Sequence, residues 1–418
     1  MKKIFFLMVA PSLFVATHAA VANAFFDETS VTGDIRFYNF STDYTDADSP
    51  SISATSLGGG LNILTGPIFS EDFKLGVSVY TARPVGLNSS NEEHLFTSLP
   101  SDSITTLGQS YLQYQHEHLL IRAGNQLIDT PWLNAADTYM IPATYQGFYG
   151  TYTLWQDITF TALRTFRFKA RTADHFTPTN LYNPENLGEH AMTAFGTTDD
   201  HGALAFGGQL KKNSWNGQLW YYQFYDLANL VYGDARYDFD NTHTVKPYVA
   251  GQALREWGSG DNILAPYAGG NAHANVFGLL TGITIQQATF SFAYNDIPKN
   301  NDTFQNGDIL SPYTVGYHSD PLYTTSMLTG LIEASSGQAI KLKAEYHTEN
   351  KAWTLSSSYA KYFVSPTMNN LNEMDFDGIY AFPGKLKGFT IQNRIGILNG
   401  SETHGRELSD RVMFQYSF

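Results

Sequence analysis

The stretch that decides the fold runs from Leu119 to Thr153 and reads LLIRAGNQLIDTPWLNAADTYMIPATYQGFYGTYT. Its two ends, 119–126 and 145–153, are short runs of apolar, aromatic and β-branched residues, which are typical of strands. The segment between them contains Pro131 and Pro142, and proline cannot donate to a ladder of strands. The sequence therefore predicts two strands joined by a long irregular segment.

This irregular segment is unusually rich in large apolar side chains for a surface loop. Trp132, Leu133, Met140 and Ile141 all lie in it, and a solvated loop has no need for them. A loop folded back against the inner wall of a barrel would bury them. We therefore expect a constricting loop that narrows a pore. The residues assigned to this constriction are Asp129, Pro131, Trp132, Asp137, Tyr139, Thr144 and Tyr145.

The first residues of the chain predict export. Lys2 and Lys3 are followed by an apolar run at 4–15 and by the small-residue triplet at 22–24, the pattern of a secretory signal peptide. We expect residues 1–24 to be removed, which leaves 25–418 as a single domain. The chain contains no cysteine, so neither a disulfide framework nor a thiolate metal site is possible.

Beyond residue 24, side chains alternate with a period of two. In the segment 339–347, Ile340 and Leu342 share one face while Lys341 and Lys343 share the other, as expected for a strand with two different faces. No apolar stretch of 18 residues follows the leader, which excludes helical spans of a membrane. Aromatic residues make up 15% of the chain. An apolar face crowded with rings and a polar face carrying cations are typical of a transmembrane β-barrel.

The spacing of the alternating segments predicts an all-β fold, a transmembrane antiparallel β-barrel of 18 strands. Short connections, such as the one at 116–118, alternate along the chain with long ones, such as 172–201 and 297–337. Outer-membrane barrels have short periplasmic turns and long outer loops. A barrel of 16 strands also stays possible, because the segment 325–333 has to be left in a loop to keep an even count.

The last strand carries an aromatic face to the end of the sequence. Phe414, Tyr416 and Phe418 alternate with polar or flexible residues, and Phe418 ends the sequence. This ending resembles the terminal signal by which outer-membrane barrels are recognised for insertion. We therefore expect the barrel-assembly machinery as a partner and the outer membrane of a Gram-negative bacterium as the location.

Three motifs resemble those of the OprD family of outer-membrane porins. They are IRAGNQ at 121–126 leading to DTP at 129–131, MIPATYQG at 140–147, and ANLVYG at 228–233. Strand count and length also agree with this family. The resemblance implies substrate-selective passive diffusion through a narrow, arginine-lined pore. The family's substrates include amino acids and peptides, carboxylates and, in chitoporin-like members, oligosaccharides.

Alternation also predicts which cations line the pore. Arg167, Lys169 and Arg171 fall on one face at spacings of about 6–7 Å, and such a row could pass an anion from one donor to the next. Arg122 is the best placed, because its strand leads into the constricting loop. Arg164 has the parity of the lipid face, so we expect either a register shift near it or a position beside lipid headgroups. The full set assigned to the pore lining is Arg36, Arg122, Arg167, Lys169, Arg171, Lys341, Lys343 and Arg394.

The composition of the constricting loop leaves the solute open. Tyr139 stands where many relatives carry arginine before the Met-x-Pro motif, which leaves room for a sugar or a zwitterion as well as a carboxylate. Asp129 and Asp137 could face the basic wall and create a transverse field that orients dipolar solutes. The interpretations are therefore a porin for amino acids, peptides or carboxylates, an oligosaccharide porin, or a structural or adhesive surface protein.

Other classes of function fit poorly. The chain has no Gly-x-Ser-x-Gly elbow, no His-Glu-x-x-His motif and no P-loop, so we expect neither an enzyme nor a cofactor. A formal net charge of −14 argues against nucleic acid as a partner. The expected partners are small solutes and outer-membrane lipids including lipopolysaccharide. The alternation does not decide between a monomer and a homotrimer.

Overall fold

The structure is a computed structural model, and it describes most of the chain beyond the predicted leader. The described residues are 25–46, 48–88, 90, 91, 99, 102–183, 199–239, 244–314, 319–364, 371–401 and 405–418. The predicted signal peptide at 1–24 lies outside them, so its removal stays a prediction.

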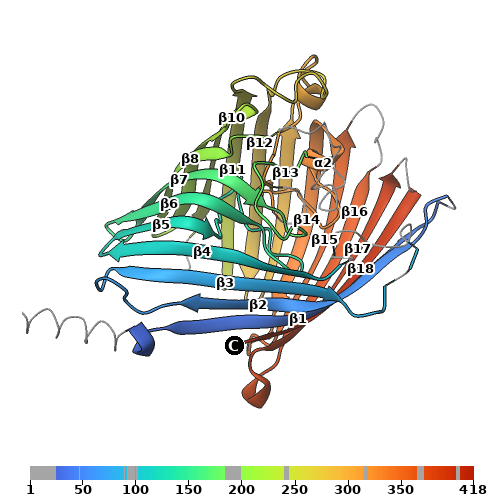
Figure 1. Cartoon of the computed structure of the whole chain (residues 1–418). Helices are drawn as coiled ribbons and strands as arrows, with labels where there is room; N and C mark the ends of the chain where they lie inside the picture. The colour runs from blue at the N-terminus through green and yellow to red at the C-terminus, as the bar shows by residue number, and fades with distance from the viewer. Residues whose placement is uncertain are drawn as a thin grey trace, which may run out of the picture.

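Eighteen antiparallel strands close into one barrel. In Figure 1 the first strand, drawn in blue, lies beside the last, drawn in red. Gly33 and Phe418 exchange two backbone hydrogen bonds of 3.0 Å at this seam. The strands are β1 Ser30–Tyr44, β2 Ile52–Leu64, β3 Phe73–Pro84, β4 Ile104–His116, β5 Leu119–Gln126, β6 Thr144–Leu154, β7 Ile158–Lys169, β8 Ala203–Lys212, β9 Trp215–Phe224, β10 Ala228–Asp238, β11 Val245–Gly258, β12 Asn275–Ile285, β13 Ala288–Ile297, β14 Gly337–His347, β15 Trp353–Val364, β16 Asn372–Ala381, β17 Phe389–Ser401 and β18 Gly405–Ser417.

The strand count confirms the barrel of 18 strands and excludes the barrel of 16. The segment 325–333, which decided between them, belongs to a long connection between β13 and β14 that includes the short helix α2, Leu331–Ala334. Figure 1 shows α2 framed by the strands of the barrel. Among the described residues, no helix combines the length and the hydropathy that a membrane span requires.

The two faces of the sheet differ as the alternation predicts. Phe290 and Leu342 on the outer face are 49% and 56% exposed, whereas Lys341 on the inner face is 8% exposed. Aromatic pairs gather where β15 to β18 meet the short turns, for example Trp353 with Tyr380 at 4.7 Å between ring centres. Such aromatic girdles mark the two membrane interfaces of transmembrane barrels. The outer surface is therefore an apolar band with an aromatic border.

The C-terminal strand β18 has the aromatic face expected of it. Phe414 and Phe418 are 46% and 52% exposed on the outer face, and Tyr416 packs on Phe389 with ring centres 4.4 Å apart. This arrangement is compatible with an insertion signal, and that role of Phe414, Tyr416 and Phe418 stays a prediction.

A β-bulge in β7 changes which of its side chains face inward. Gln146 pairs with Arg167, but the next residue, Gly147, pairs with Thr165, so Phe166 is the extra residue. A bulge of one residue reverses the alternation beyond it. Phe168 is consequently buried inside the barrel, 5.4 Å from the ring of Tyr145.

Candidate functional site

The loop 127–143 crosses the interior of the barrel. Trp132 is fully buried, with its ring 6.0 Å from that of Tyr232 on β10. At the other end of the loop, Met140 and Ile141 are buried in a cluster that includes Tyr38 of β1. The loop that leaves β5 therefore packs on β10 and on β1, and the prediction of an inward-folded loop with buried apolar side chains is confirmed.

The loop is tied to the barrel wall by an ion pair. Arg36 on β1 donates from Nη1 and Nη2 to the two carboxylate oxygens of Asp137, at 2.6 and 2.9 Å. Its Nη1 also donates to the carbonyl of Tyr139 at 2.7 Å, and its Nε lies 2.7 Å from Asp34. Asp137 therefore neutralises Arg36 and holds the loop. Asp137 thus faces one cation of the predicted basic wall, Arg36, and the transverse field that would orient dipolar solutes stays a prediction.

The other residues assigned to the constriction have mixed environments. Tyr139, Thr144 and Tyr145 are buried, and the Tyr145 hydroxyl donates to the carbonyl of Asn134 at 2.8 Å. Asp129 is exposed and Pro131 is half-buried. The buried members stabilise the loop, and only exposed side chains such as Asp129 remain available to a solute.

Two members of the predicted cation row support this loop from beneath. Lys169 is fully buried and donates from Nζ to the carbonyls of Ala170 and Pro142 at 3.0 and 3.3 Å. Arg171 is 3% exposed, lies 4.4 Å from the ring centre of Tyr139 and donates to Thr138 Oγ1 at 3.0 Å. The prediction that these two cations line the pore is wrong, because protein atoms cover them.

The third member of the row lies on the other side of the wall. The bulge at Phe166 puts Arg167 opposite Gln146, on the outer face of the sheet, where it is exposed. Arg164 lies on the same face, opposite Phe148 and Leu204, and the bulge begins only after it. The assignment of Arg167 to the pore is therefore wrong, because strict alternation does not hold through the bulge.

A cavity of about 310 Å³ lies under the loop 127–143. Arg122 lines it from β5, with its guanidinium 4.8 Å from the ring centre of Tyr111 and its Nε donating to Gln113 at 2.8 Å. Arg36 and Asp137 line the same cavity. Within the described part of the chain, Arg122 has no ion pair with a carboxylate. It is therefore a cation that a solute in this cavity can reach.

A second cavity, of about 500 Å³, lies along the inner faces of β12 to β17. Three predicted pore residues line it, Lys341, Lys343 and Arg394. Lys343 pairs with Glu345 at 2.9 Å and Arg394 with Asp377 at 3.0 Å, while Lys341 donates to the carbonyl of Thr325. These cations face the interior as predicted, but each has a partner in the protein.

A second loop folded into the barrel was missed from the sequence. The segment 298–336 carries the buried side chains Met327, Leu328 and Leu331. Glu373 of β16 accepts hydrogen bonds from the backbone amides of Leu328 and Thr329 at 2.6 and 2.9 Å. The same signal that revealed the first loop, large apolar side chains in a long connection, is present in this one.

An inward-facing arginine was also missed. Arg411 on β18 lies directly opposite Arg394 on β17 and is 3% exposed. Its guanidinium is 4.6 Å from the ring centre of Phe40 on β1. The alternation of Phe414 and Tyr416 already placed odd-numbered residues of this strand on the inner face, so the signal was available.

Burial raises the pKa of several carboxyl groups in the long connections between strands. Burial raises the pKa of Asp320 to about 6, although hydrogen bonds from Thr325 and Leu322 and the charge of Lys341 oppose the shift. Burial also raises the pKa of Asp308 in the loop 298–336 and of Asp200 in the connection between β7 and β8. The charged forms of these groups are disfavoured in the packed loops, so the packing of the loops depends on pH.

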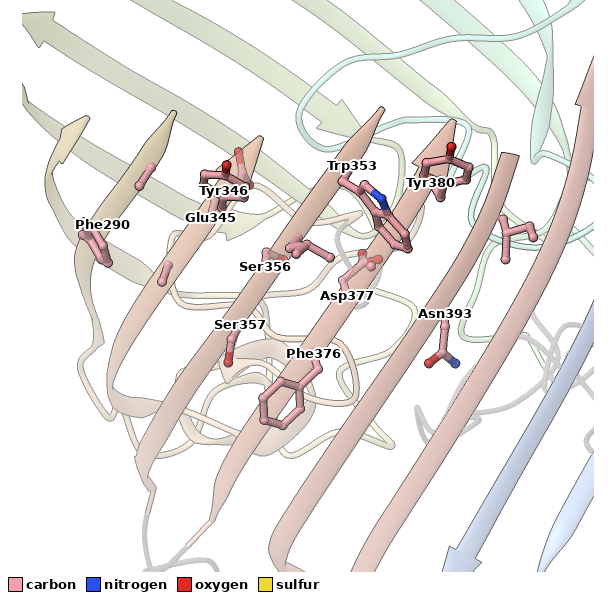
Figure 2. Close-up of a pocket in the computed structure, with 15 residues that line it drawn as sticks. Phe290, Glu345, Tyr346, Trp353, Ser356, Ser357, Phe376, Asp377, Tyr380 and Asn393 are labelled. Carbon is pink, nitrogen blue, oxygen red and sulfur yellow. The ribbon is translucent and has the colours of Figure 1, made fainter. Parts of the chain in front are cut away.

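A recess of about 880 Å³ lies outside the lumen. Figure 2 shows its border of Phe290, Tyr346, Trp353, Phe376 and Tyr380, side chains of the outer face that are all part of the apolar band. Its lining is mainly apolar, although Ser357 and Asn393 also border it, and it faces away from the interior. This recess is therefore no part of a path through the lumen.

The comparisons with known proteins agree with this architecture. No family model and no curated protein matches the sequence. Solved structures do match, over 94% of this chain and 99% of each of theirs. They include Pseudomonas aeruginosa OpdK with vanillate (13% identity, TM-score 0.73), P. aeruginosa OccK9 (OpdG; 15%, 0.79) and Acinetobacter baumannii OccAB2 (18%, 0.77). These proteins are OprD/Occ-family porins. The chain therefore has the barrel fold of the OprD/Occ porins, as its motifs predicted.

Proposed function

We propose that this protein is an outer-membrane porin through which small carboxylates diffuse passively, passing Arg122 in the cavity under the loop 127–143. The observation that carries the proposal is the arginine itself. Arg122 lines the cavity, and its Nη1 and Nη2 have no acceptor among the described residues, whereas Arg36 beside it is bonded to Asp137. A guanidinium stays charged at any relevant pH and can hold a carboxylate through two parallel hydrogen bonds.

The aromatic rings beside the arginines support carboxylates that carry a ring. Tyr111 lies under Arg122, and farther along the interior Arg236 lies 3.7 Å from the ring centre of Tyr248. Stacking restricts a guanidinium without using its N–H groups. A flat solute can then contact the ring while its carboxylate meets the arginine. Structures with this fold contain vanillate in OpdK and glucuronate in P. aeruginosa OccK2 (OpdF), and both compounds are carboxylates on a six-membered ring.

Amino acids and peptides remain within this proposal. Asp34 and Asp137 line the same cavity as Arg122 and could attract an ammonium group while the arginine holds the carboxylate. The oligosaccharide alternative relied on an aromatic surface at Tyr139. That side chain is 3% exposed and lies under Arg171, so it offers no platform for a sugar.

The proposal can be tested by solute uptake into proteoliposomes. We expect vanillate, glucuronate and glutamate to enter faster than lysine or a chitin disaccharide. The variant Arg122→Gln should reduce the carboxylate rates about tenfold, as expected for loss of one charge-assisted hydrogen-bonding partner. The matched control Lys343→Gln removes an inner cation that is already paired with Glu345 and should change little. Equal uptake of all solutes would contradict carboxylate selectivity, and no uptake by the folded barrel would favour a structural or adhesive role.

A further inference from the structure

The outer face of β7 carries two arginines at one end of the apolar band. Arg164 lies opposite Phe148, and the bulge at Phe166 brings Arg167 opposite Gln146 on the same face. Phe148, Phe160 and Phe206 are about half exposed on this outer surface. β7 ends at Lys169, where the long connection 170–202 begins. Both arginines are therefore near the long-loop end of the barrel, above exposed aromatic side chains.

Arg164 is held in a fixed orientation. Its guanidinium lies 4.6 Å from the ring centre of Phe166 and 4.3 Å from that of Tyr225. Its Nη1 donates to the carbonyl of His201 at 2.7 Å and also contacts the carbonyl of Thr165. All of these bonds use Nη1, so Nε and Nη2 have no acceptor among the described residues.

Arg167 is exposed, and the described part of the chain offers it no hydrogen-bonding or ionic partner. It continues a row of polar side chains across the outer face. Gln146 donates to Asn125 Oδ1 at 3.1 Å, and Asn125 donates to Ser110 Oγ at 3.2 Å. Asp226, which follows the Tyr225 that stacks on Arg164, is bonded to His201 at 2.8 Å. No described carboxylate neutralises the two arginines.

Unpaired arginines are costly on the lipid side of a barrel, by about 2–4 kcal/mol at the bilayer midplane and by less near the interfaces. An anionic group at the membrane interface removes this cost and is complementary to two guanidinium groups, whose planar N–H forks match phosphate oxygens. The aromatic side chains below the arginines would contact the acyl chains attached to such a group. An anchored amphiphile therefore fits this place better than a free anion.

We propose that the patch formed by Ser110, Asn125, Gln146, Arg164 and Arg167 binds the phosphate of a membrane lipid in the leaflet next to the long loops. Arg164 donates to the phosphate from Nε and Nη2, which its stacked position already orients. Arg167 donates to the same phosphate from its neighbouring position on β7. The amide row of Gln146 and Asn125 supplies further donors for the headgroup. This site is on the opposite face of the wall from the solute cavity, so it is independent of carboxylate transport.

The test uses the purified, folded protein in detergent, with native mass spectrometry to count bound lipids. The probes are bisphosphorylated lipid A, lipid A without phosphate, and inorganic phosphate as a competitor. We expect the wild type to retain bisphosphorylated lipid A and to bind the form without phosphate at least about tenfold more weakly. Arg167→Gln should weaken binding about tenfold, and Arg164→Gln with Arg167→Gln should weaken it further.

The matched control is Lys361→Gln, because Lys361 is an outer-face cation that lies over the ring of Phe363, 5.3 Å from its centre, far along the barrel on β15. It should leave binding unchanged. Equal retention by the control and the double variant, equal binding of lipid A without phosphate, or displacement by inorganic phosphate would each overturn the proposal. Arg164 packs between two rings, so its replacement in the double variant can prevent folding. The single variant Arg167→Gln leaves Arg164 in place and tests the proposal in that case.

Discussion

Two of the loops that fold into this barrel, 127–143 and 298–336, are attached to its wall in different ways. The loop 127–143 is tied to β1 through Arg36 and Asp137, and the side chain of Asp137 is 42% exposed next to a cavity. The loop 298–336 is tied to β16 through Glu373, a fully buried carboxylate that accepts from two backbone amides. One of these attachments is an ion pair whose carboxylate is exposed, and the other is a buried backbone clamp.

Because of this difference, we expect the two loops to have different roles in the lumen. A buried clamp cannot exchange its partners with a solute, so we expect the loop 298–336 to fix the width of the lumen. The Asp137 carboxylate is exposed beside a cavity, whereas Arg36 is buried. We therefore expect a charged solute that competes for Asp137 to weaken this ion pair and shift the loop 127–143. Arg122, which has no ion pair among the described residues, lines the cavity under the loop 127–143.

The largest effect is expected from releasing the buried clamp. Glu373→Ala leaves the amides of Leu328 and Thr329 without their acceptor, at a cost of about 1–3 kcal/mol for each buried N–H. The loop 298–336 should leave the lumen part of the time, and single-channel conductance should rise several-fold with new protease cleavage in this loop. Glu345→Gln is the matched control. An unchanged conductance in Glu373→Ala would show that the loop does not limit the lumen.

A smaller effect is expected from breaking the accessible ion pair. Asp137→Asn removes the carboxylate that neutralises Arg36, so a second cation becomes available beside Arg122. The ratio of anion to cation permeability should rise a few-fold, measured from reversal potentials in a salt gradient. Asp129→Asn, at an exposed position of the same loop, is the control. A fall in this ratio would mean that Asp137 acts on solutes rather than on Arg36.

The two loops should also differ in their response to pH. Burial raises the pKa of Asp320 from its ordinary value of 3.8 to about 6, so the docked loop binds this proton more tightly than the released loop does. Docking of 298–336 is therefore strongest below about pH 4 and weakens as the pH rises through 6. Protease cleavage of this loop should increase over that range, and Asp320→Asn should flatten the dependence. Cleavage that increases toward acid pH would contradict the assignment.

The smallest effect is expected at a paired cation in the second cavity. Lys343 is 44% exposed and pairs with Glu345, and such exposed pairs contribute about 0–1 kcal/mol. Lys343→Gln should therefore leave conductance and the thermal unfolding midpoint nearly unchanged. A loss of anion selectivity comparable to that of Arg122→Gln would indicate that the solute path runs along the second cavity, on the β12–β17 side of the lumen.

Alternation, even strand count and connection lengths were sufficient to predict the barrel, because each depends on local sequence. The same local signals identified the loop 127–143 through its proline and large apolar residues. They failed in β7, because the bulge at Phe166 reverses the alternation. The lipid-face parity of Arg164 indicated a register shift nearby but not its position. Arg167 was consequently assigned to the wrong face.

Burial within the lumen could not be predicted from alternation either. Lys169 and Arg171 lie beyond the regular part of β7, and the loop 127–143 covers them. That packing depends on contacts between segments far apart in the sequence. The loop 298–336 carries the apolar signal of the first loop, but its docking position could not be predicted, because its acceptors Glu373 and Glu256 come from strands on either side of it in sequence.

The most direct test of the central claim is the reversal potential of the reconstituted channel in a gradient of a sodium carboxylate, compared between wild type and Arg122→Gln. If the unpaired Arg122 sets the preference for carboxylates, the wild type should be anion-selective and the variant should lose most of that selectivity while conducting at a similar level. An identical reversal potential in the two proteins would contradict the claim and place the selectivity elsewhere in the lumen.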